Sequence, residues 1–378
     1  MEWLQYAVHY PLYFIVLISV LVFVHEFGHY WVARRCGVKV EKFSIGFGPE
    51  VFGWNDSHGT RWRFALFPLG GYVKMFGDAD PASSPDKDAI THMTDEEKKV
   101  AFFFQPVAKR AAIVFAGPLA NYIFAWVVLT VVFVLIGQPF TKPVVDNLIE
   151  KMPAAAAGIK IGDEIKSING EAIERFEELQ QYVRLRPGEN VTLVIQRGEE
   201  TKTVPVTLAR DNMTDRFGND HPIGMLGIKS QGLAYQKQTI PVAIYQAVKE
   251  TYTVSKNTLM ALGQIVMGQR SSSELGGPLR IAQMSGEVAE QGFVPWMMLM
   301  VLISINLGLI NLFPIPILDG GHLVFYAAEA LRGKPVPLEV QDIAYRGGMV
   351  LVMMLMVFAM WNDLVQLRII SYLVNLVS

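Results

Sequence analysis

The part of the sequence with the clearest chemical potential is the motif His-Glu-x-x-His, formed by His25, Glu26 and His29. Residues four positions apart lie on one face of a helix, so the two imidazoles can bind a single Zn²⁺. Glu26 can take a proton from the attacking water, which is the chemistry of zinc-dependent hydrolysis. The motif follows a run without charges from Pro11 to Val24. The sequence therefore predicts a zinc site on a membrane-spanning helix, where ionisable groups are costly and usually functional.

A third zinc ligand is expected after the third apolar segment, where Pro314 and Pro316 remove two backbone donors and break the helix. Asp319 follows this break and can complete a His₂Asp site that leaves a fourth position for water. His322 is a rival ligand; we favour Asp319 because a carboxylate completes common catalytic sites that contain two histidines. Two asparagines before the break could hydrogen-bond a substrate backbone or the developing oxyanion. They are Asn306 and Asn311.

The composition is that of a membrane protein. Of the 378 residues, 51% are hydrophobic and 18% are charged, below the fraction of about a quarter that is usual in soluble proteins. The formal charge of −2 and the lack of Lys/Arg-rich runs argue against nucleic-acid binding. The single cysteine, Cys36, excludes an intrachain disulfide and a cysteine-based zinc cluster. Metal ligands must therefore come from His, Asp or Glu.

The predicted fold is a polytopic α-helical membrane protein with about four transmembrane helices. Basic residues directly follow the first helix, beginning with Arg34 and Arg35, so this end is expected in the cytoplasm. The N-terminus then lies outside, and the zinc motif lies toward the cytoplasmic side. The expected spans are residues 6–34, 111–141, 292–318 and 347–361.

The segment of residues 38–76 is expected to form a β-hairpin that dips to the membrane beside the zinc site, because it combines alternation, glycines and aromatics. Non-helical backbone survives at that depth only if it is paired or buried in protein. Its second half, from Phe64 to Met75, could hold a substrate as an added strand. The candidate contacts are Gly70, Gly71, Tyr72 and Val73. An ordinary cytoplasmic hairpin is the alternative interpretation.

The remaining segments divide as follows. Residues 77–99 are polar and predict a flexible cytoplasmic loop. The expected domains are residues 1–140 with the first two spans, an extracytoplasmic α+β domain at 141–232, amphipathic membrane-surface helices at 233–291, and the last two spans at 292–378. Within the last of these, residues 369–377 are too short to span and are expected along the outer surface.

The order of these motifs resembles the site-2 protease family of intramembrane zinc metalloproteases. The resemblance covers nearly the whole chain and rests on five motifs, which are His-Glu-x-x-His, Gly-Phe-Gly-Pro, Pro-Leu-Gly-Gly-Tyr-Val-Lys-Met, Gly-Pro-Leu-Ala-Asn and Asn-x-Phe-Pro-x-Pro-x-Leu-Asp-Gly-Gly-His. Gly-Asp-Glu-Ile-Lys-Ser-Ile-Asn-Gly, which ends at Gly170, resembles the PDZ domains of bacterial envelope proteases. Such domains bind extended peptides along a sheet edge; a steric filter above the site is the alternative.

The resemblance implies roles for particular residues. By position, His25, His29 and Asp319 would bind one zinc ion per chain, and Glu26 would be the general base. The asparagines and prolines of the third span would shape substrate binding. The implied substrates are an anti-sigma factor of the inner membrane, cleaved after a first extracytoplasmic cut, and remnant signal peptides. Membrane lipid surrounds the chain, which we expect to be a monomer.

One departure from the family pattern concerns the extracytoplasmic domain. The sigma-E-regulating members typically carry two tandem PDZ domains, and residues 141–230 have room for one. A shortened form or a relative with a single PDZ domain would both explain this.

Two non-proteolytic functions also compete. One is a membrane receptor whose His/Asp cluster is structural. The zinc content of the purified protein would distinguish such a receptor from a protease. The other is a metal transporter, which the lack of further intramembrane carboxylates argues against.

Overall fold

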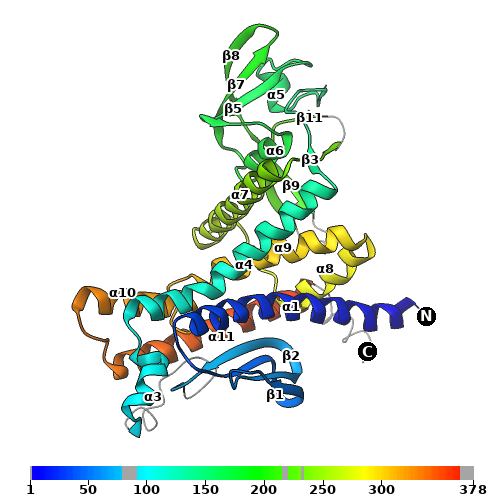
Figure 1. The fold of residues 1–378 in the computed structure, drawn as a ribbon. Helices are drawn as coiled ribbons and strands as arrows, with labels where there is room; N and C mark the ends of the chain where they lie inside the picture. The colour runs from blue at the N-terminus through cyan, green and yellow to red at the C-terminus, as the bar shows by residue number, and fades with distance from the viewer. Residues whose placement is uncertain (1, 79–91, 215–219, 231–233, 367–378) are drawn as a thin grey trace. The chain divides into compact units, whose positions relative to one another are not determined.

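The computed structural model describes residues 2–78, 92–214, 220–230 and 234–366 (Figure 1). The chain forms two compact units, and each is described by itself. The helical unit comprises Met1–Leu129, Ile244–Lys256 and Leu275–Asp363. The second unit comprises Thr130–Ala243, Asn257–Glu274 and Leu364–Ser378, and we call it the PDZ-like unit after the sequence motif that ends at Gly170.

Four helices among the described residues are long and apolar enough to cross a membrane, which matches the predicted number. They are α1 (Glu2–Arg35), α4 (Val107–Leu135), α9 (Phe293–Asn311) and α11 (Leu338–Gln366). The predicted second span extended too far, because α4 ends at Leu135 and Gly137 takes a φ of 113°. A positive φ cannot continue a right-handed helix, so the chain turns there into β3 (Gln138–Phe140).

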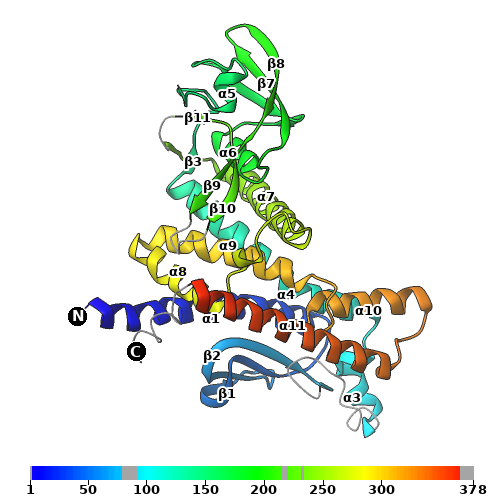
Figure 2. The ribbon, with the colours of Figure 1, turned by 180° about the vertical axis from the view of Figure 1, so that it is seen from behind.

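Residues 40–75 form an antiparallel hairpin of β1 (Val40–Asn55) and β2 (Arg61–Met75). It lies alongside α1 (Figure 2). Phe43 is opposite Val73 in the strand register, and both are buried in one apolar cluster with residues of α1 and α4. This packing of one hairpin face holds β2 against the helix that carries the His-Glu-x-x-His motif.

The prediction of a flexible loop at residues 77–99 is wrong for the last part of this segment. Residues 79–91 lie outside the described residues, but Asp95–Val100 forms helix α3. Thr94 and Glu97 form a reciprocal capping box at its start, which satisfies two backbone donors that a helix end otherwise leaves unpaired. The remaining helices of the unit are α8 (Pro278–Glu290) and α10 (Asp319–Arg332), with the short η1 (Phe102–Phe104) before α4.

The PDZ-like unit is built on a four-stranded sheet in the order β6-β5-β7-β8. Its strands are β5 (Glu164–Ile168), β6 (Glu171–Ala172), β7 (Asn190–Arg197) and β8 (Glu200–Thr207). Helix α6 (Phe176–Arg184) buries Leu179 and Val183 in the core of this unit. The short α5 (Pro153–Ala156) contributes Ala154 to the same core.

Three further strand pairs complete this unit, and they are β9 (Ala209–Thr214) with β10 (Asp220–Met225), β11 (Ile228–Lys229) with β4 (Asn147–Leu148), and β12 (Ala234–Gln236) with β3. Within the segment at 233–291, where amphipathic helices were expected, the structure has α7 (Ile240–Val266), η2 (Ser272–Glu274) and α8. The expected surface tail at 369–377 lies outside the described residues.

Candidate metal centre

His25, His29 and Asp319 lie together, with their ligand atoms all within 4.8 Å of one another. His25 Nε2 is 3.2 Å from Asp319 Oδ2, and His29 Nε2 is 3.6 Å from Asp319 Oδ1. The two Nε2 atoms are 3.2 Å apart. Both histidines are buried, and the side chain of Asp319 is 17% exposed. Two elements from opposite ends of the sequence therefore meet at one point.

The donor set of this cluster fits a divalent cation. His29 Nδ1 is 2.9 Å from the carbonyl oxygen of Ile113, a pure acceptor, so the imidazole proton resides on Nδ1. The unprotonated Nε2 then turns its lone pair toward the other two groups. A buried carboxylate and two imidazole lone pairs facing one another repel unless a cation lies between them. Two imidazoles and a carboxylate are a common ligand set of catalytic zinc, so the residues present fit this metal.

Asn121 of α4 supports the second histidine. Its amide nitrogen, Nδ2, lies 3.2 Å from His25 Nδ1, and Asn121 is fully buried. The Asn121 amide oxygen is buried and has no hydrogen-bond partner among the described residues. Turning the amide over would exchange its two atoms, so that this oxygen accepts the Nδ1 proton of His25 and leaves Nε2 free as a ligand. Ser304 of α9 donates to the backbone carbonyl of Asn121 at 3.0 Å and links a third helix to this position. The polar partner of Asn121 across the helix contact is thus a candidate metal ligand, His25.

Two glycines allow α1 and α4 to approach closely at the cluster. A Cβ on Gly117 would collide with the ring of His29, and a Cβ on Gly28 would collide with the backbone of Ala116. Both glycines are helical, where glycine costs roughly 1 kcal/mol relative to alanine. Glycine is nevertheless required at position 117, because a Cβ there would occupy the space of the His29 imidazole.

The loop between α9 and α10 brings Asp319 to the two histidines. Ile317 has a φ of 102°, which is a genuine outlier for a β-branched residue, and it lies two positions before Asp319. A Cβ on Gly320 or Gly321 would collide with carbonyl groups of this loop. The Gly-Gly pair after Asp319 therefore lets the loop fold back on the first turn of α10. Sequence reasoning used this pair only for the family resemblance.

A cavity of about 180 Å³ opens beside the cluster, and it contains Glu26, Val73 and Asn311 in its lining. The backbone amide of Val73 faces the Glu26 carboxylate. A Cβ on Gly71 would lie 3.4 Å from Glu26 Cγ and would collide with Val22. The second half of the hairpin thus borders the group expected to act as general base.

The other predicted contact residues lie farther from this cavity. Among the described residues, the cavity lining does not include Asn306, Pro314 or Pro316. The ring of Tyr72 stacks on the ring of Phe47, and a Cβ on Gly70 would collide with the Phe47 ring.

His322, the rival third ligand, lies outside the cluster of three but lines the cavity. Its Nδ1 is 3.2 Å from the hydroxyl oxygen of Tyr345 on α11. The imidazole is buried, so this contact fixes the ring near the site. Asp319, rather than His322, lies with the two histidines of α1.

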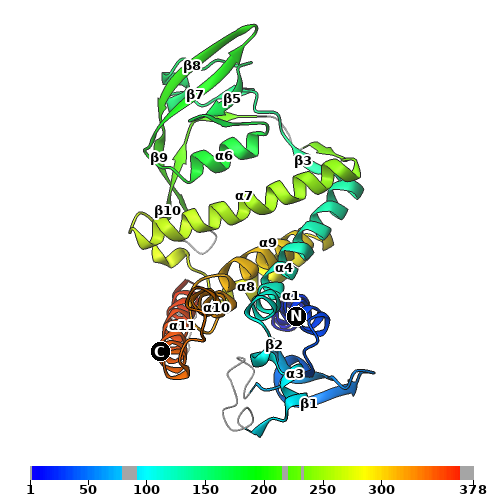
Figure 3. The same cartoon turned by 60° about the vertical axis from the view of Figure 1, so that its left-hand side comes forward.

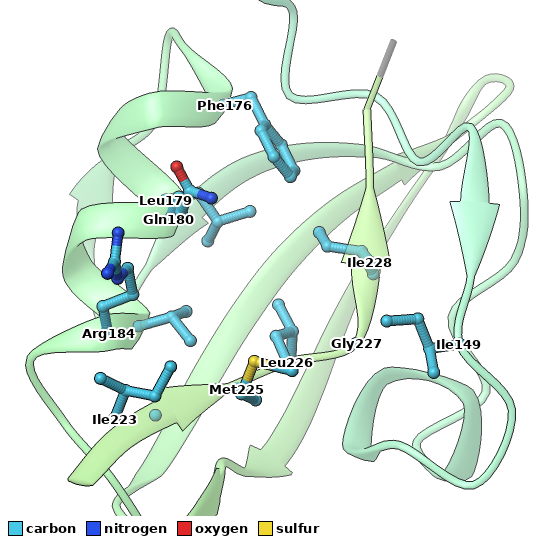
Figure 4. A pocket seen from close by; sticks show the side chains of 12 residues that line it. Ile149, Phe176, Leu179, Gln180, Arg184, Ile223, Met225, Leu226, Gly227 and Ile228 are labelled. Carbon is cyan, nitrogen blue, oxygen red and sulfur yellow. The ribbon is translucent and has the colours of Figure 1, made fainter. Parts of the chain in front are cut away.

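A second cavity, of about 310 Å³, lies in the PDZ-like unit between α6 and the chain segment 223–228 (Figure 4). Its walls are mostly aliphatic or aromatic, and Arg184 lies at one end. The apolar side chains that line it include Phe176, Leu179, Ile223, Leu226 and Ile228.

Comparison with known proteins agrees with the chemistry of the cluster. The sequence profile of Peptidase family M50 matches residues 13–355. A protein of Agrobacterium fabrum named as a candidate zinc metalloprotease is 43% identical over 93% of this chain and 94% of its own length. The metalloprotease MmpA of Caulobacter vibrioides is 36% identical over 92% of this chain and 93% of its own. The PDZ domain of an SdrC-like protein from Listeria monocytogenes covers 25% of this chain and 90% of its own, at 21% identity and a TM-score of 0.20.

Proposed function

The chain belongs to peptidase family M50 and is a zinc metalloprotease, and from this premise we propose that it cleaves transmembrane segments of single-pass membrane proteins. The observation that carries this proposal is the position of the cluster. Two of its three ligands lie on α1, a helix long and apolar enough to cross a membrane, so the site is within reach of a substrate helix in the bilayer.

The residues around the cavity have different roles in peptide hydrolysis. Zinc bound by His25, His29 and Asp319 would polarise the scissile carbonyl and promote ionisation of the attacking water. Glu26 takes the proton from this water and returns it to the leaving amine. Asn311 lines the same cavity and can hydrogen-bond the substrate backbone or its oxyanion.

The hairpin holds the substrate in extended form. A transmembrane helix has its carbonyl groups already hydrogen-bonded, so it must unwind before a peptide bond can react. The closeness of Gly71 and Val73 to Glu26 supports strand addition beside β2. Substrate residues added there would pass the general base in an extended conformation.

The proposed substrates are an anti-sigma factor, after a first extracytoplasmic cut, and remnant signal peptides, as part of an envelope stress response in the bacterial inner membrane. The basic residues at the end of α1 support an orientation with the N-terminus outside and the zinc site near the cytoplasm. The PDZ-like domain would then lie outside. Its apolar cavity supports a role in selecting peptides before they reach the site.

Substitution of the general base tests this function. Glu26→Gln should abolish cleavage of a reporter that carries a model transmembrane segment, while zinc content stays near one ion per chain. Cleavage by the parent protein should stop with a chelator and return with Zn²⁺. A Glu26→Gln protein that still cleaves the reporter would refute the mechanism, and a parent protein without near-stoichiometric metal would favour a structural His/Asp cluster.

A further inference from the structure

The first two turns of α4 contact both halves of the candidate metal centre. The carbonyl oxygen of Ile113 lies 2.9 Å from Nδ1 of His29 on α1. Three residues earlier, Arg110 Nη2 lies 2.5 Å from Oε1 of Glu329 on α10, the helix that begins with Asp319. Figure 3 shows this end of α4 next to α1 and α10. One short stretch of α4 therefore contacts the helix of the histidines and the helix of the third candidate ligand.

The ion pair of Arg110 and Glu329 is buried, and its guanidinium group has further contacts. The two side chains are 11% and 13% exposed. Arg110 Nε donates to the backbone carbonyl of Gln105 at 3.0 Å, and the guanidinium carbon lies 4.9 Å from the centroid of the Tyr326 ring. Tyr326 is also on α10, three residues before Glu329. The guanidinium group therefore contacts α10 at both a carboxylate and an aromatic ring, while Gln105 fixes its position.

The ion pair and the candidate ligand lie on one face of α10. Asp319, Leu323, Tyr326 and Glu329 follow one another at intervals of four, three and three residues, close to the helical period of about 3.6. Tyr326 is buried in the apolar cluster that includes residues of α1 and α4, and Leu323 packs against this cluster. Asp319 and Glu329 are separated by about 15 Å of helix. The face that carries Asp319 at one end is thus held by Arg110 at the other.

The ion pair restricts rotation of α10 more than the apolar contacts do, because hydrogen bonds to a charged group are directional. A side-chain atom lies roughly 5–6 Å from the helix axis, so a rotation of α10 by about 10° would move the Asp319 carboxylate by about 1 Å. Metal–ligand distances tolerate deviations of only about 0.2 Å. A buried ion pair adds little net stability, since the loss of hydration offsets the attraction. Its main effect is therefore expected on the position of Asp319.

We propose that Arg110 and Glu329 are positioning residues of the zinc site, which fix the rotation of α10 so that the Asp319 carboxylate faces the two histidines. Neither residue belongs to the cluster of three candidate ligands. The inference concerns metal binding and does not depend on the substrate. It can fail while cleavage of transmembrane segments, as proposed above, still stands.

The test is the paired replacement Arg110→Met/Glu329→Leu, which removes both charges together. Apolar residues in place of a buried ion pair are often neutral or stabilising, so the metal-free protein should unfold thermally at or above the temperature of the parent. Its zinc affinity, measured by competition with a chelator, should fall by about 10- to 100-fold, as for other residues that orient a ligand. Parent-like zinc affinity in the paired variant would overturn the proposal.

A second variant keeps the charge and changes only the reach of the side chain. Glu329→Asp is one methylene shorter, so α10 must shift to keep the ion pair with Arg110. The visible absorption of Co²⁺ bound in place of zinc depends on the geometry of the ligands, and we expect it to differ from that of the parent. An unchanged Co²⁺ spectrum would contradict the positioning role, and this measurement decides the matter if the paired variant does not fold.

The matched control is an exposed ion pair of the same unit. Lys99 Nζ lies 2.7 Å from Oε1 of Glu96 on α3, and the two side chains are 68% and 83% exposed. Lys99→Met/Glu96→Leu makes the same kind of change away from α10 and should leave both zinc affinity and the Co²⁺ spectrum unchanged. If this control loses as much affinity as the paired variant of Arg110 and Glu329, the effect is not specific to α10 and the proposal is wrong.

Discussion

Replacing Gly117 by alanine should remove His29 from the metal site while preserving the fold. A Cβ built at this position would lie 2.2 Å from His29 Nε2, and ordinary van der Waals contact begins at 3.4 Å. The imidazole would have to move by about 1.2 Å, the difference between these two distances. Metal–ligand distances tolerate deviations of only about 0.2 Å, so His29 could no longer act as a ligand.

The expected effect is much larger on zinc binding than on stability. Even changes to residues that support a ligand cost 10- to 100-fold in metal affinity, so we expect a loss of about 100-fold or more for Gly117→Ala. Overpacking costs roughly 1–3 kcal/mol in stability, and the higher helix propensity of alanine offsets about 1 kcal/mol of this. Zinc affinity is measured by competition with a chelator, and stability by thermal unfolding of the metal-free protein.

Gly347→Ala is the matched control. Gly347 lies inside α11, and a Cβ there would meet no atom within 4 Å. This variant should keep the zinc affinity of the parent and gain about 1 kcal/mol in stability. The reasoning is refuted if Gly117→Ala binds zinc like the parent, or if both variants lose the same affinity.

Three further perturbations test other parts of the structure. Asn121→Ala should lower zinc affinity by about 10- to 100-fold, whereas Asn121→Asp, which keeps an acceptor for His25 Nδ1, should lose less; equal losses would contradict a supporting role. The Arg197 guanidinium beside Asp163 holds the pKa of that carboxyl below its usual range. This pair therefore stabilises the PDZ-like unit fully above the unfolded pKa of about 3.9, and the contribution is lost as the pH falls through the lower folded pKa. Arg197→Gln should move the loss of hydrogen-exchange protection in β5 to higher pH, and an unchanged acid profile would contradict this. Val73→Pro should abolish reporter cleavage but retain zinc, because it removes the backbone amide that faces Glu26, whereas proline at the exposed Val51 should be tolerated. Loss of zinc with Val73→Pro would mean that the hairpin only supports the fold.

The ligand cluster could be predicted because its pattern is local at each end. His25 and His29 share a helix face through spacing alone, and the two prolines before Asp319 show where the third span must break. The choice of Asp319 over His322 depended on the chemistry of known zinc sites. The structure places the two residues differently, since Asp319 joins the histidines and His322 contacts Tyr345.

The supporting contacts could not be predicted because they depend on tertiary packing. Nothing in the sequence shows that a Cβ on Gly320 would collide with carbonyl groups of the preceding loop, or that Ile317 takes a positive φ. The end of α4 was also misplaced, since its apolar run continues beyond Leu135 and only the backbone of Gly137 ends the helix. Periodicity and composition identify elements, whereas close approaches between elements decide such details.

The division of the ligand set between α1 and α10 has a consequence for biosynthesis. A ribosome makes the two histidines near the start of translation and Asp319 near its end. Until α10 emerges, the growing chain has two imidazoles and a general base but lacks the carboxylate that completes the site. If these three residues bind the zinc, we expect the nascent protein to be proteolytically inactive until α10 has been synthesised. We expect the same of truncated chains that end before α10, so incomplete synthesis would give inactive fragments rather than an unregulated protease.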